Sequence, residues 1–283
     1  MAPRISSYMT SDVKVVTPSD TLAHARRIML RHGIGRLVVV DENEPSRPIG
    51  MLTITDIMDA LLGRLSARPI DSILVGEVYT PDPITIERTR TVKSAAILML
   101  RHKIGGLPVV DEKGSLVGII TRSDLVRAYA DRYHGYYKVA DIMRRDFPTA
   151  TKGHSIFHVA KIVMAEPSGK VVVVDGDRVV GVVTKRDLAF ANIPPRGRNA
   201  KFYKVKSVDR YRDKVVSLRV YNIPIVEDVM TPDPITIEPD RDSADAAAVM
   251  VREGIGILPV VGEGEKLQGI VTKLEILEAM ASK

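Results

Sequence analysis

One unit recurs four times along the chain, and this repetition limits the possible fold more than any other feature of the sequence. Residues 78–87 recur as residues 229–238 with nine of ten positions identical. A Gly-x-x-Thr-x-x-acid signature closes each unit, and its four acids are Asp56, Asp124, Asp187 and Glu275. A unit of about 55 residues is too small to close a core alone, so each unit is expected to bury one face against another.

The spacing of the signatures defines four repeats, at 6–62, 75–130, 138–192 and 226–281. The joins between the first and second repeats and between the second and third are short, whereas residues 193–225 form an insertion before the fourth. This spacing predicts two paired modules, residues 1–134 and residues 135–283, with the insertion inside the second.

Each repeat is expected to fold as β-α-β-β-α, which makes the chain an α/β (α+β) protein. In the second repeat Val92, Ala95, Ala96 and Met99 follow the i, i+3, i+4, i+7 spacing of one helix face. A glycine such as Gly33 stands where a left-handed helix end is expected. Two β-branched strands follow, at 37–40 and 49–53 in the first repeat, and a second helix begins at the Thr-x-x-acid motif.

The composition excludes several classes of protein. The chain has no cysteine, which excludes disulfides, thiolate catalysis and cysteine metal sites. No apolar run approaches the length of about 18 residues that spans a bilayer, and the N-terminus lacks a signal-peptide core, so a cytoplasmic protein is expected. One glutamine and four asparagines beside abundant Lys, Arg and Glu are typical of a thermophile.

The sequence contains no pattern of a catalytic or metal centre. It has no nucleophile–base pair, Walker loop or dinucleotide fingerprint, so a protein that is not an enzyme is expected. His154 and His158 have i, i+4 spacing, but no carboxylate with ligand spacing accompanies them, so no metal site is predicted.

The positive charge of the chain is concentrated in the insertion. Residues 193–225 carry nine basic and two acidic residues, a local charge of +7, whereas the whole chain carries +6. Within it, residues 201–208 and 214–221 alternate with a period near two, which predicts a hairpin. Interleaved aromatic residues would allow this hairpin to stack on the bases of a nucleic acid. The alternative interpretation is a hairpin that packs on the partner module or on a second subunit.

The repeated motifs resemble those of the cystathionine-β-synthase (CBS) domain, with four copies paired as two Bateman modules. Four-repeat chains of this kind resemble the γ subunit of AMP-activated protein kinase and its stand-alone archaeal relatives. The resemblance implies that paired repeats bind adenosine-containing ligands in clefts between them. It also implies that Asp56, Asp124 and Asp187 accept hydrogen bonds from the ribose hydroxyls.

The resemblance further implies a wider set of ligand-binding residues, which approach the phosphate or the adenosine. They come from the first, short strand of each repeat (the entry strand), from the Gly-x-Leu-Pro stretch and from the Thr-x-x-acid motifs. These residues are Thr17, Arg36, Thr53, Thr85, Thr121, Arg122, Ser123, Thr184, Lys185, Arg186, Thr236, Thr272 and Lys273.

Physical chemistry supports the same assignment. A carboxylate offers two acceptor oxygens to the two donors of a cis-diol. The free N–H groups and the dipole at a helix N-terminus favour a nearby anion. The glycine of the motif, for example Gly118, is expected to allow close approach of the backbone to the ligand.

Two features keep alternatives open. Thr-x-x-acid is also a capping box, and Glu275, one methylene longer than Asp, is expected to act only as a cap. The histidine of the kinase γ pattern is replaced by Gly35, Gly105 and Gly256, so a ligand with little phosphate, such as S-adenosylmethionine, stays possible beside AMP, ADP and ATP.

The sequence therefore predicts a non-catalytic regulatory protein that senses energy or metabolite state through an adenosyl ligand. The expected partners are this small molecule and either a second copy of the chain or an unidentified regulated protein, with no membrane. The alternative is a nucleic-acid-binding protein that acts weakly through the hairpin 193–225, with the repeats as scaffold. An adaptor with inactive sites is a third hypothesis.

Overall fold

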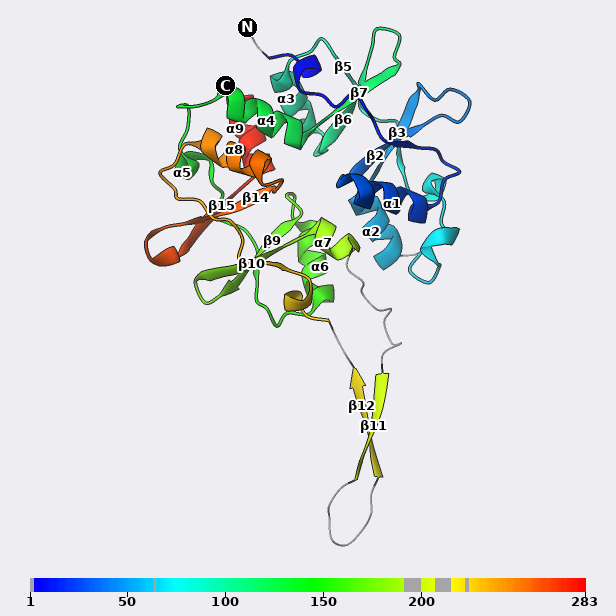
Figure 1. Cartoon of the computed structure of the whole chain (residues 1–283), viewed down its shortest axis with the longest axis vertical. Helices are drawn as coiled ribbons and strands as arrows, with labels where there is room; N and C mark the ends of the chain where they lie inside the picture. The colour runs from blue at the N-terminus through cyan, green and yellow to red at the C-terminus, as the bar shows by residue number, and fades with distance from the viewer. Residues whose placement is uncertain (1–2, 64, 191–199, 207–214, 222–223) are drawn as a thin grey trace.

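The apolar spacing of each repeat produces the same elements four times in the computed structural model (Figure 1). The structure describes residues 3–63, 65–190, 200–206, 215–221 and 224–283. The first repeat contains β1 (Val15–Val16), α1 (Leu22–His32), β2 (Arg36–Val40), β3 (Pro48–Thr53) and α2 (Ile54–Leu62). The second contains β4 (Thr80–Pro81), β5 (Ile86–Glu87), α3 (Val92–Arg101), β6 (Gly106–Val110), β7 (Leu116–Thr121) and α4 (Arg122–Arg132).

The second half of the chain repeats this order. The third repeat contains α5 (Val139–Ile142), β8 (Thr149–Ala150), α6 (Ile156–Ala165), β9 (Lys170–Asp175), β10 (Arg178–Thr184) and α7 (Lys185–Phe190). The fourth contains β13 (Thr231–Pro232), α8 (Ser243–Arg252), β14 (Ile257–Val261), β15 (Leu267–Thr272) and α9 (Lys273–Ser282). The predicted β-α-β-β-α order and the mixed α/β class are confirmed. Within the described part of the chain, no helix is both long and apolar enough to cross a membrane.

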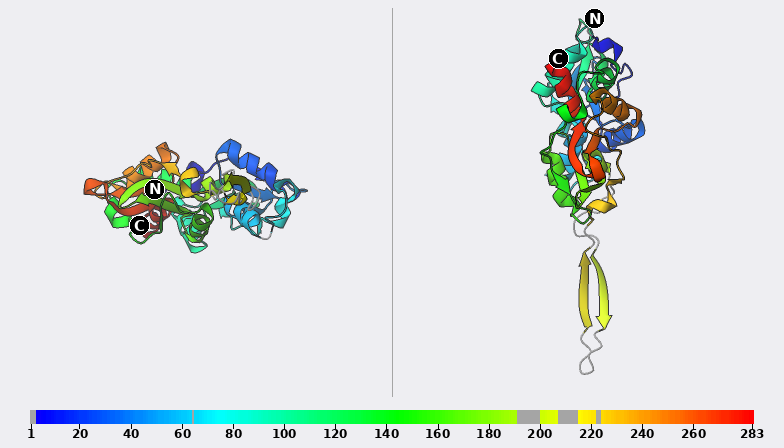
Figure 2. Two further views of the ribbon diagram at one scale, coloured as in Figure 1. Left: turned by 90° about the horizontal axis from the view of Figure 1, so that it is seen from below. Right: turned by 90° about the vertical axis from the view of Figure 1, so that its left-hand side faces the viewer.

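The insertion contains β11 (Ala200–Lys206) and β12 (Val215–Tyr221), which pair antiparallel from Ala200 opposite Tyr221 to Lys206 opposite Val215. These two strands project away from the four repeats, which together form a flattened disc (Figures 1 and 2).

Neighbouring repeats exchange the segments that precede their first long helix, which we call the entry segments. Strand β4, at the start of the second repeat, pairs with β3 of the first, and Thr10, at the start of the first repeat, pairs with Ile119 of β7. The same exchange joins β13 to β10 and Arg144 to Ile270 of β15. Each strand that leads into a Thr-x-x-acid motif is therefore flanked by the backbone of the other repeat in the pair.

The sheets and the helices form separate cores. Val38, Val40 and Ile119 join the sheets of the first two repeats, and an equivalent cluster with Val172 and Ile270 joins those of the last two. The helical cores follow a different pairing, because one contains the main helices of the second and fourth repeats and the other contains those of the first and third. Helix α4 packs on α8 and α9, and α2 packs on α7. The helices therefore hold the two halves of the chain together.

Candidate functional site

Each Thr-x-x-acid motif lies at the junction between the last strand of its repeat and the helix that follows. In all four motifs the acid at the third helical position accepts hydrogen bonds from the N–H and the hydroxyl of the threonine, which closes a capping box. For Asp124 these two bonds to Oδ2 are 2.8 and 2.7 Å long. The threonines that make them are Thr53, Thr121, Thr184 and Thr272.

The capping box engages only one oxygen of each aspartate. In Asp56 and Asp187 both bonds go to Oδ2, and Oδ1 has no hydrogen-bond partner among the described residues. Since a carboxylate oxygen carries two acceptor positions, Oδ1 can accept two further bonds. Burial raises the pKa of Asp56 above its ordinary value, against the bonds from Thr53, which lower it. Helix capping and ligand binding are therefore compatible functions of one side chain.

Asp124 differs from these two acids because its second oxygen has a partner. The Arg127 guanidinium, one turn further along α4, donates to Oδ1 at 3.2 Å and also to the carbonyl of Tyr8. The Arg127 side chain is 47% exposed and lies at the surface of the same helix. A ligand that bonds to Oδ1 of Asp124 would have to replace this surface contact.

The motif glycines contact protein, which corrects the expectation that they allow close approach to a ligand. A Cβ at Gly118 would lie 2.8 Å from the sulfur of Met9 and 3.1 Å from the carbonyl oxygen of Thr10. At Gly50 the ring of Tyr79 would lie only 2.2 Å from the added carbon. The space beside each motif glycine is filled by the entry segment of the paired repeat, because the two repeats exchange these segments.

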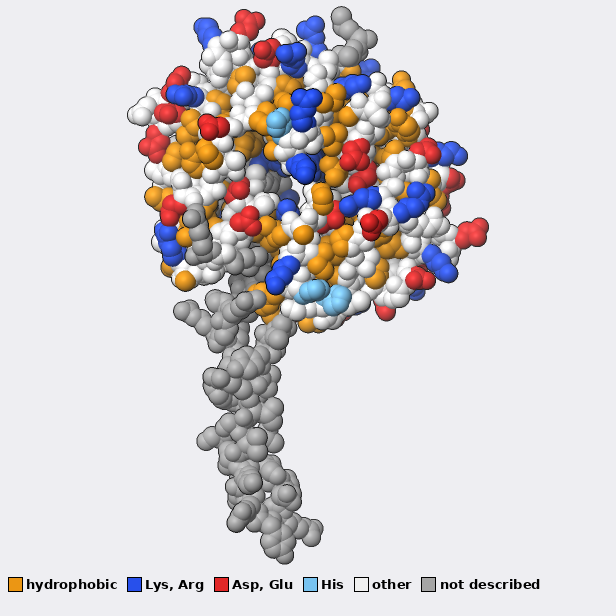
Figure 3. All heavy atoms as spheres, turned by 180° about the vertical axis from the view of Figure 1, so that it is seen from behind, with side chains coloured by type: hydrophobic (Ala, Val, Ile, Leu, Met, Phe, Trp, Pro, Cys, Tyr) orange, Lys and Arg blue, Asp and Glu red, His pale blue; other side chains and the backbone are white. Residues whose placement is uncertain are grey.

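Five basic side chains from all four repeats lie close enough to one another to interact, and we call them the central cation cluster: Arg36, Arg122, Lys170, Lys185 and Lys273. The face drawn in Figure 3 is hollowed near its middle, and Lys and Arg side chains are visible at the hollow. A Cβ on Gly256 would lie 3.0 Å from Cε of Lys170 and 3.2 Å from Cε of Lys273, so these two lysines lie side by side. Acids of the motifs lie beside the cluster, because Asp124 interacts with Arg36, Glu275 with Lys170 and Asp56 with Lys185.

Burial and mutual repulsion perturb this cluster. Burial, followed by the positive charges of Lys273 and Arg122, lowers the pKa of Lys170 to about 8. Burial and the charge of Arg122 lower the pKa of Arg36 to about 10. Burial also lowers the pKa of Lys185 and of Lys273. Like charges held together in partly buried positions are stabilised by a bound anion.

The cations of one half of the chain contact motifs in the other half. Lys273 Nζ donates to the Ser123 hydroxyl at 2.7 Å, and Lys185 Nζ lies 3.4 Å from the Thr55 hydroxyl. In both pairs, the lysine directly follows the threonine of its own motif, and its partner directly precedes the acid of a motif in the other half of the chain. Arg186, by contrast, is exposed and donates to the carbonyl of Gly33.

The three predicted threonines of the first strands differ in register. Thr85 and Thr236 precede the residues that pair with the next strand, and both are exposed. Thr17 follows its paired residue Val16, so it is not equivalent to the other two. Its hydroxyl donates to Asp20. The period-two pattern predicts the strands but not the register between them. From the sequence alone, these three threonines are therefore treated as equivalent.

Sequence reasoning missed Lys170. It pairs with Thr184 at the start of β9, exactly as Arg36 pairs with Thr53 at the start of β2, so the two cations occupy equivalent positions. The third repeat lacks the Ile-Gly pattern that precedes this strand in the other three repeats, so the equivalence of Lys170 and Arg36 was not recognised. An alignment of the two strands would have revealed it.

The residues that would carry nucleic-acid binding in the alternative hypothesis lie outside the described side chains of the structure. Their role stays a prediction. Among the described residues, no group of three or more His, Asp or Glu side chains is placed to hold a metal ion. His154 accepts a hydrogen bond from the N–H of Thr151 through Nδ1.

Comparisons with known proteins give the same architecture. The chain is 27% identical over 95% of its length to the uncharacterized protein MJ1225 of Methanocaldococcus jannaschii, and covers 96% of that protein. The crystal structure of MJ1225, described as a candidate archaeal homologue of γ-AMPK, superposes with a TM-score of 0.78 at 24% identity. That alignment covers 97% of this chain and 99% of MJ1225, and it supports the fold.

Two further solved structures match less than half of the chain. CBSX2 of Arabidopsis thaliana in complex with AMP covers 46% of this chain at 27% identity, with 99% of its own length matched and a TM-score of 0.41. The CBS domain pair of MJ0100, in complex with 5′-methylthioadenosine and S-adenosyl-L-methionine, covers 44% of this chain at 27% identity, with 98% of its own length matched and a TM-score of 0.39.

The family model for the CBS domain matches four segments, residues 5–63, 75–131, 139–193 and 226–282. These segments coincide with the four repeats and together cover most of the chain. The chain belongs to the CBS-domain family and carries four copies of the domain.

Proposed function

We propose that the chain is a non-catalytic regulatory protein that binds phosphorylated adenosine nucleotides between paired repeats. The observation that carries this proposal is the central cation cluster beside the three aspartate motifs. A nucleotide with its ribose on Oδ1 of Asp56, Asp124 or Asp187 would direct its phosphate toward these cations. The modules that form the sites are residues 1–134 and 135–283, in agreement with the exchange of entry segments within each pair.

The cluster favours AMP, ADP or ATP over S-adenosylmethionine. Five partly buried cations repel one another, and a phosphate relieves this repulsion, whereas the sulfonium of S-adenosylmethionine adds a positive charge. The residues that would contact phosphate are Arg36, Arg122, Lys170, Lys185 and Lys273. Bound nucleotide would link the two halves of the chain, because these cations come from all four repeats, and would favour one arrangement of the halves.

Calorimetric titration of the chain with adenosine, AMP, ATP and S-adenosylmethionine tests the proposal. AMP and ATP are expected to bind more tightly than adenosine, and their affinity is expected to fall as salt increases. A ligand present at about 100 times its Kd should raise the free energy of unfolding by about 2.7 kcal/mol. Tighter binding of S-adenosylmethionine than of AMP, or no binding of any adenosine compound, would contradict the proposal.

A further inference from the structure

At each motif site, one residue of the paired repeat lies opposite the residue that follows the motif glycine. This residue is a threonine at three sites and an arginine at the fourth. The residue that pairs with the position after the motif glycine is Thr10 opposite Ile119, Thr80 opposite Met51, and Thr231 opposite Val182. At the fourth site this residue is Arg144, opposite Ile270. The three threonines therefore accompany the three aspartates, and the arginine accompanies Glu275.

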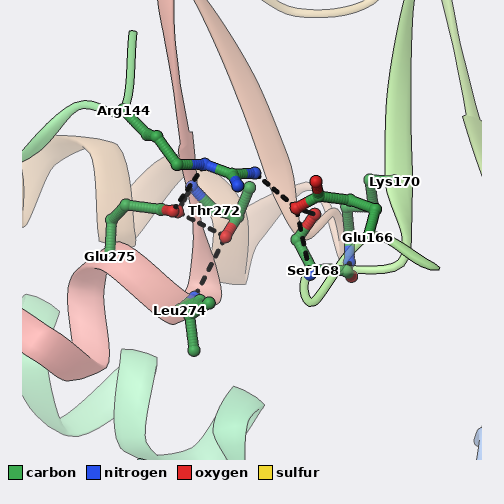
Figure 4. A network of polar contacts seen from close by, with 7 residues as sticks. All are labelled: Arg144, Glu166, Ser168, Lys170, Thr272, Leu274 and Glu275. Carbon is green, nitrogen blue, oxygen red and sulfur yellow. Dashed lines mark hydrogen bonds and ion pairs between the residues drawn. The ribbon is translucent and has the colours of Figure 1, made fainter. Parts of the chain in front are cut away.

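The Arg144 side chain lies between two buried carboxylates (Figure 4). Its Nη2 donates to Oε1 of Glu166 at 2.5 Å, and its Nε lies 3.5 Å from Oε1 of Glu275. The side chains of Glu166 and Glu275 are only 6% and 3% exposed. The remaining oxygen of Glu275 accepts from the N–H and the hydroxyl of Thr272, and Glu166 also accepts from the Ser168 hydroxyl. The network connects the third repeat to the motif of the fourth.

Arg144 places a donor beside the oxygen of Glu275 that corresponds to the open oxygen of Asp56 and Asp187. The contact is an ion pair without a hydrogen bond, and it places the guanidinium where a diol would donate to the acid at the other motifs. We propose that Arg144 is a built-in occupant of the fourth site and keeps the nucleotide out of it. This inference rests on the proposed function at the other three motifs.

Displacement of Arg144 would be costly. It would remove the hydrogen-bonded cation of the buried Glu166 and the ion-pair partner of the buried Glu275, and loss of the direct partner of a buried charge is strongly unfavourable. The contact between Asp124 and Arg127 lacks this property, because the Arg127 side chain is half-exposed and comes from the same helix as Asp124. The chain is therefore expected to bind nucleotide at up to three motif sites, and never at the fourth.

The double variant Arg144→Thr/Glu275→Asp tests this inference, because it gives the fourth site the residues found at the other three. Calorimetric titration with AMP is expected to show one additional equivalent bound per chain relative to the unaltered protein. Arg145→Thr is the matched control, because it removes the same charge from the adjacent, exposed position and should leave the stoichiometry unchanged.

The outcomes separate the two proposals. If the unaltered chain binds no AMP, the proposed function fails. If it binds AMP but the folded double variant gains no equivalent, the role of Arg144 is wrong. A crystal structure of the unaltered chain with saturating AMP provides a measurement that needs no variant. Arg144 still paired with Glu166 and Glu275 supports the inference, and nucleotide at the fourth motif overturns it.

Discussion

At the scale of single residues, the two oxygens of Asp56 and Asp187 have different surroundings, because one caps a helix and the other has no hydrogen-bond partner among the described residues. Oδ2 of Asp187 completes the capping box with Thr184, while Oδ1 remains open. Removal of the whole carboxylate therefore changes stability and binding together. A variant that keeps an acceptor for the cap and replaces the open oxygen by a donor separates the two effects.

Asp187→Asn is that variant. Its amide oxygen can still accept from Thr184, whereas its NH₂ group cannot accept from a ribose hydroxyl. We expect the affinity for AMP at this site to fall about ten- to a hundredfold, because bonds to a charged acceptor contribute about 1.5–3 kcal/mol each. Asp187→Ala should show the same loss and, in addition, lose about 0.5–2 kcal/mol of stability with the cap. Calorimetric titration and thermal unfolding of both variants provide the comparison.

Glu275→Gln is the internal control for this experiment. It keeps the capping acceptor at a site where we expect no nucleotide. Its AMP affinity and stoichiometry should equal those of the unaltered chain. Unchanged binding in Asp187→Asn would show that Asp187 is a cap only.

We expect Lys170 to make the proposed nucleotide binding dependent on pH. Its pKa in the folded chain is about 8, below the ordinary value of about 10.4 in the unfolded chain. Between these values the unfolded chain holds more protons, so the contribution of Lys170 to stability increases with pH across this window. A bound phosphate favours the charged form and raises the pKa of Lys170. Binding of AMP at pH 8.5 should therefore take up protons, and affinity should decrease as the pH rises above about 8.

Proton uptake is measured by calorimetric titration in buffers with different ionisation enthalpies. Lys170→Arg is the control, because an arginine stays charged throughout this range. The uptake should decrease in this variant, while AMP still binds. Equal uptake in both proteins would exclude Lys170 as its source.

At the scale of the elements, the motif glycines fit each strand to the entry segment of the paired repeat. Gly118→Ala would place a Cβ 2.8 Å from the sulfur of Met9 and 3.1 Å from the carbonyl of Thr10. Because the carbonyl belongs to paired backbone, relief requires movement of the bridge between Thr10 and Ile119. We expect a loss of about 1–3 kcal/mol in the free energy of unfolding, measured by urea denaturation.

Gly153→Ala is the control for this substitution. A Cβ at Gly153 has no neighbour within 4 Å, and its φ does not lie in the left-handed region. This variant should therefore be neutral or more stable by less than about 1 kcal/mol. Equal stability of the two variants would show that the contact with Met9 is readily relieved.

At the scale of the whole molecule, the helical cores join the two halves of the chain. Tyr129 of α4 is fully buried and its hydroxyl shares a 2.9 Å hydrogen bond with the Ser243 hydroxyl of α8, which is also buried. Small residues such as Ala244, Ala246 and Ala247 are likewise buried on α8. Neither half can cover this face alone.

Residues 1–134 expressed alone should therefore self-associate. The isolated half exposes the apolar face of α3 and α4 that α8 and α9 cover in the whole chain, and an exposed patch of this kind drives association. Sedimentation equilibrium should show a concentration-dependent dimer that dissociates more readily in a Tyr129→Asp variant. A well-folded monomer at high concentration would contradict this expectation.

The sequence by itself determined the local structure of the chain. The spacing of Val92, Ala95, Ala96 and Met99 predicted a buried helix face, and all four are fully buried in α3. Gly33 ends α1 with a φ of 65°, as its position after the apolar pattern predicted. The four Thr-x-x-acid motifs each close a capping box at a helix start. These features depend on residues a few positions apart, so their pattern is visible in the sequence.

Only the tertiary structure decided which distant residues meet. Lys273 reaches Ser123 across 150 positions, and Arg144 reaches Glu275 through the exchange of entry segments. Neither contact has a local pattern, because both depend on how the strands register and on how the helices of the two halves pack. The acids of the candidate sites could therefore be predicted from the sequence. Four of the five cations beside them were predicted as well, whereas Lys170 and the contact of Arg144 with Glu275 were not, because packing between repeats brings these residues together.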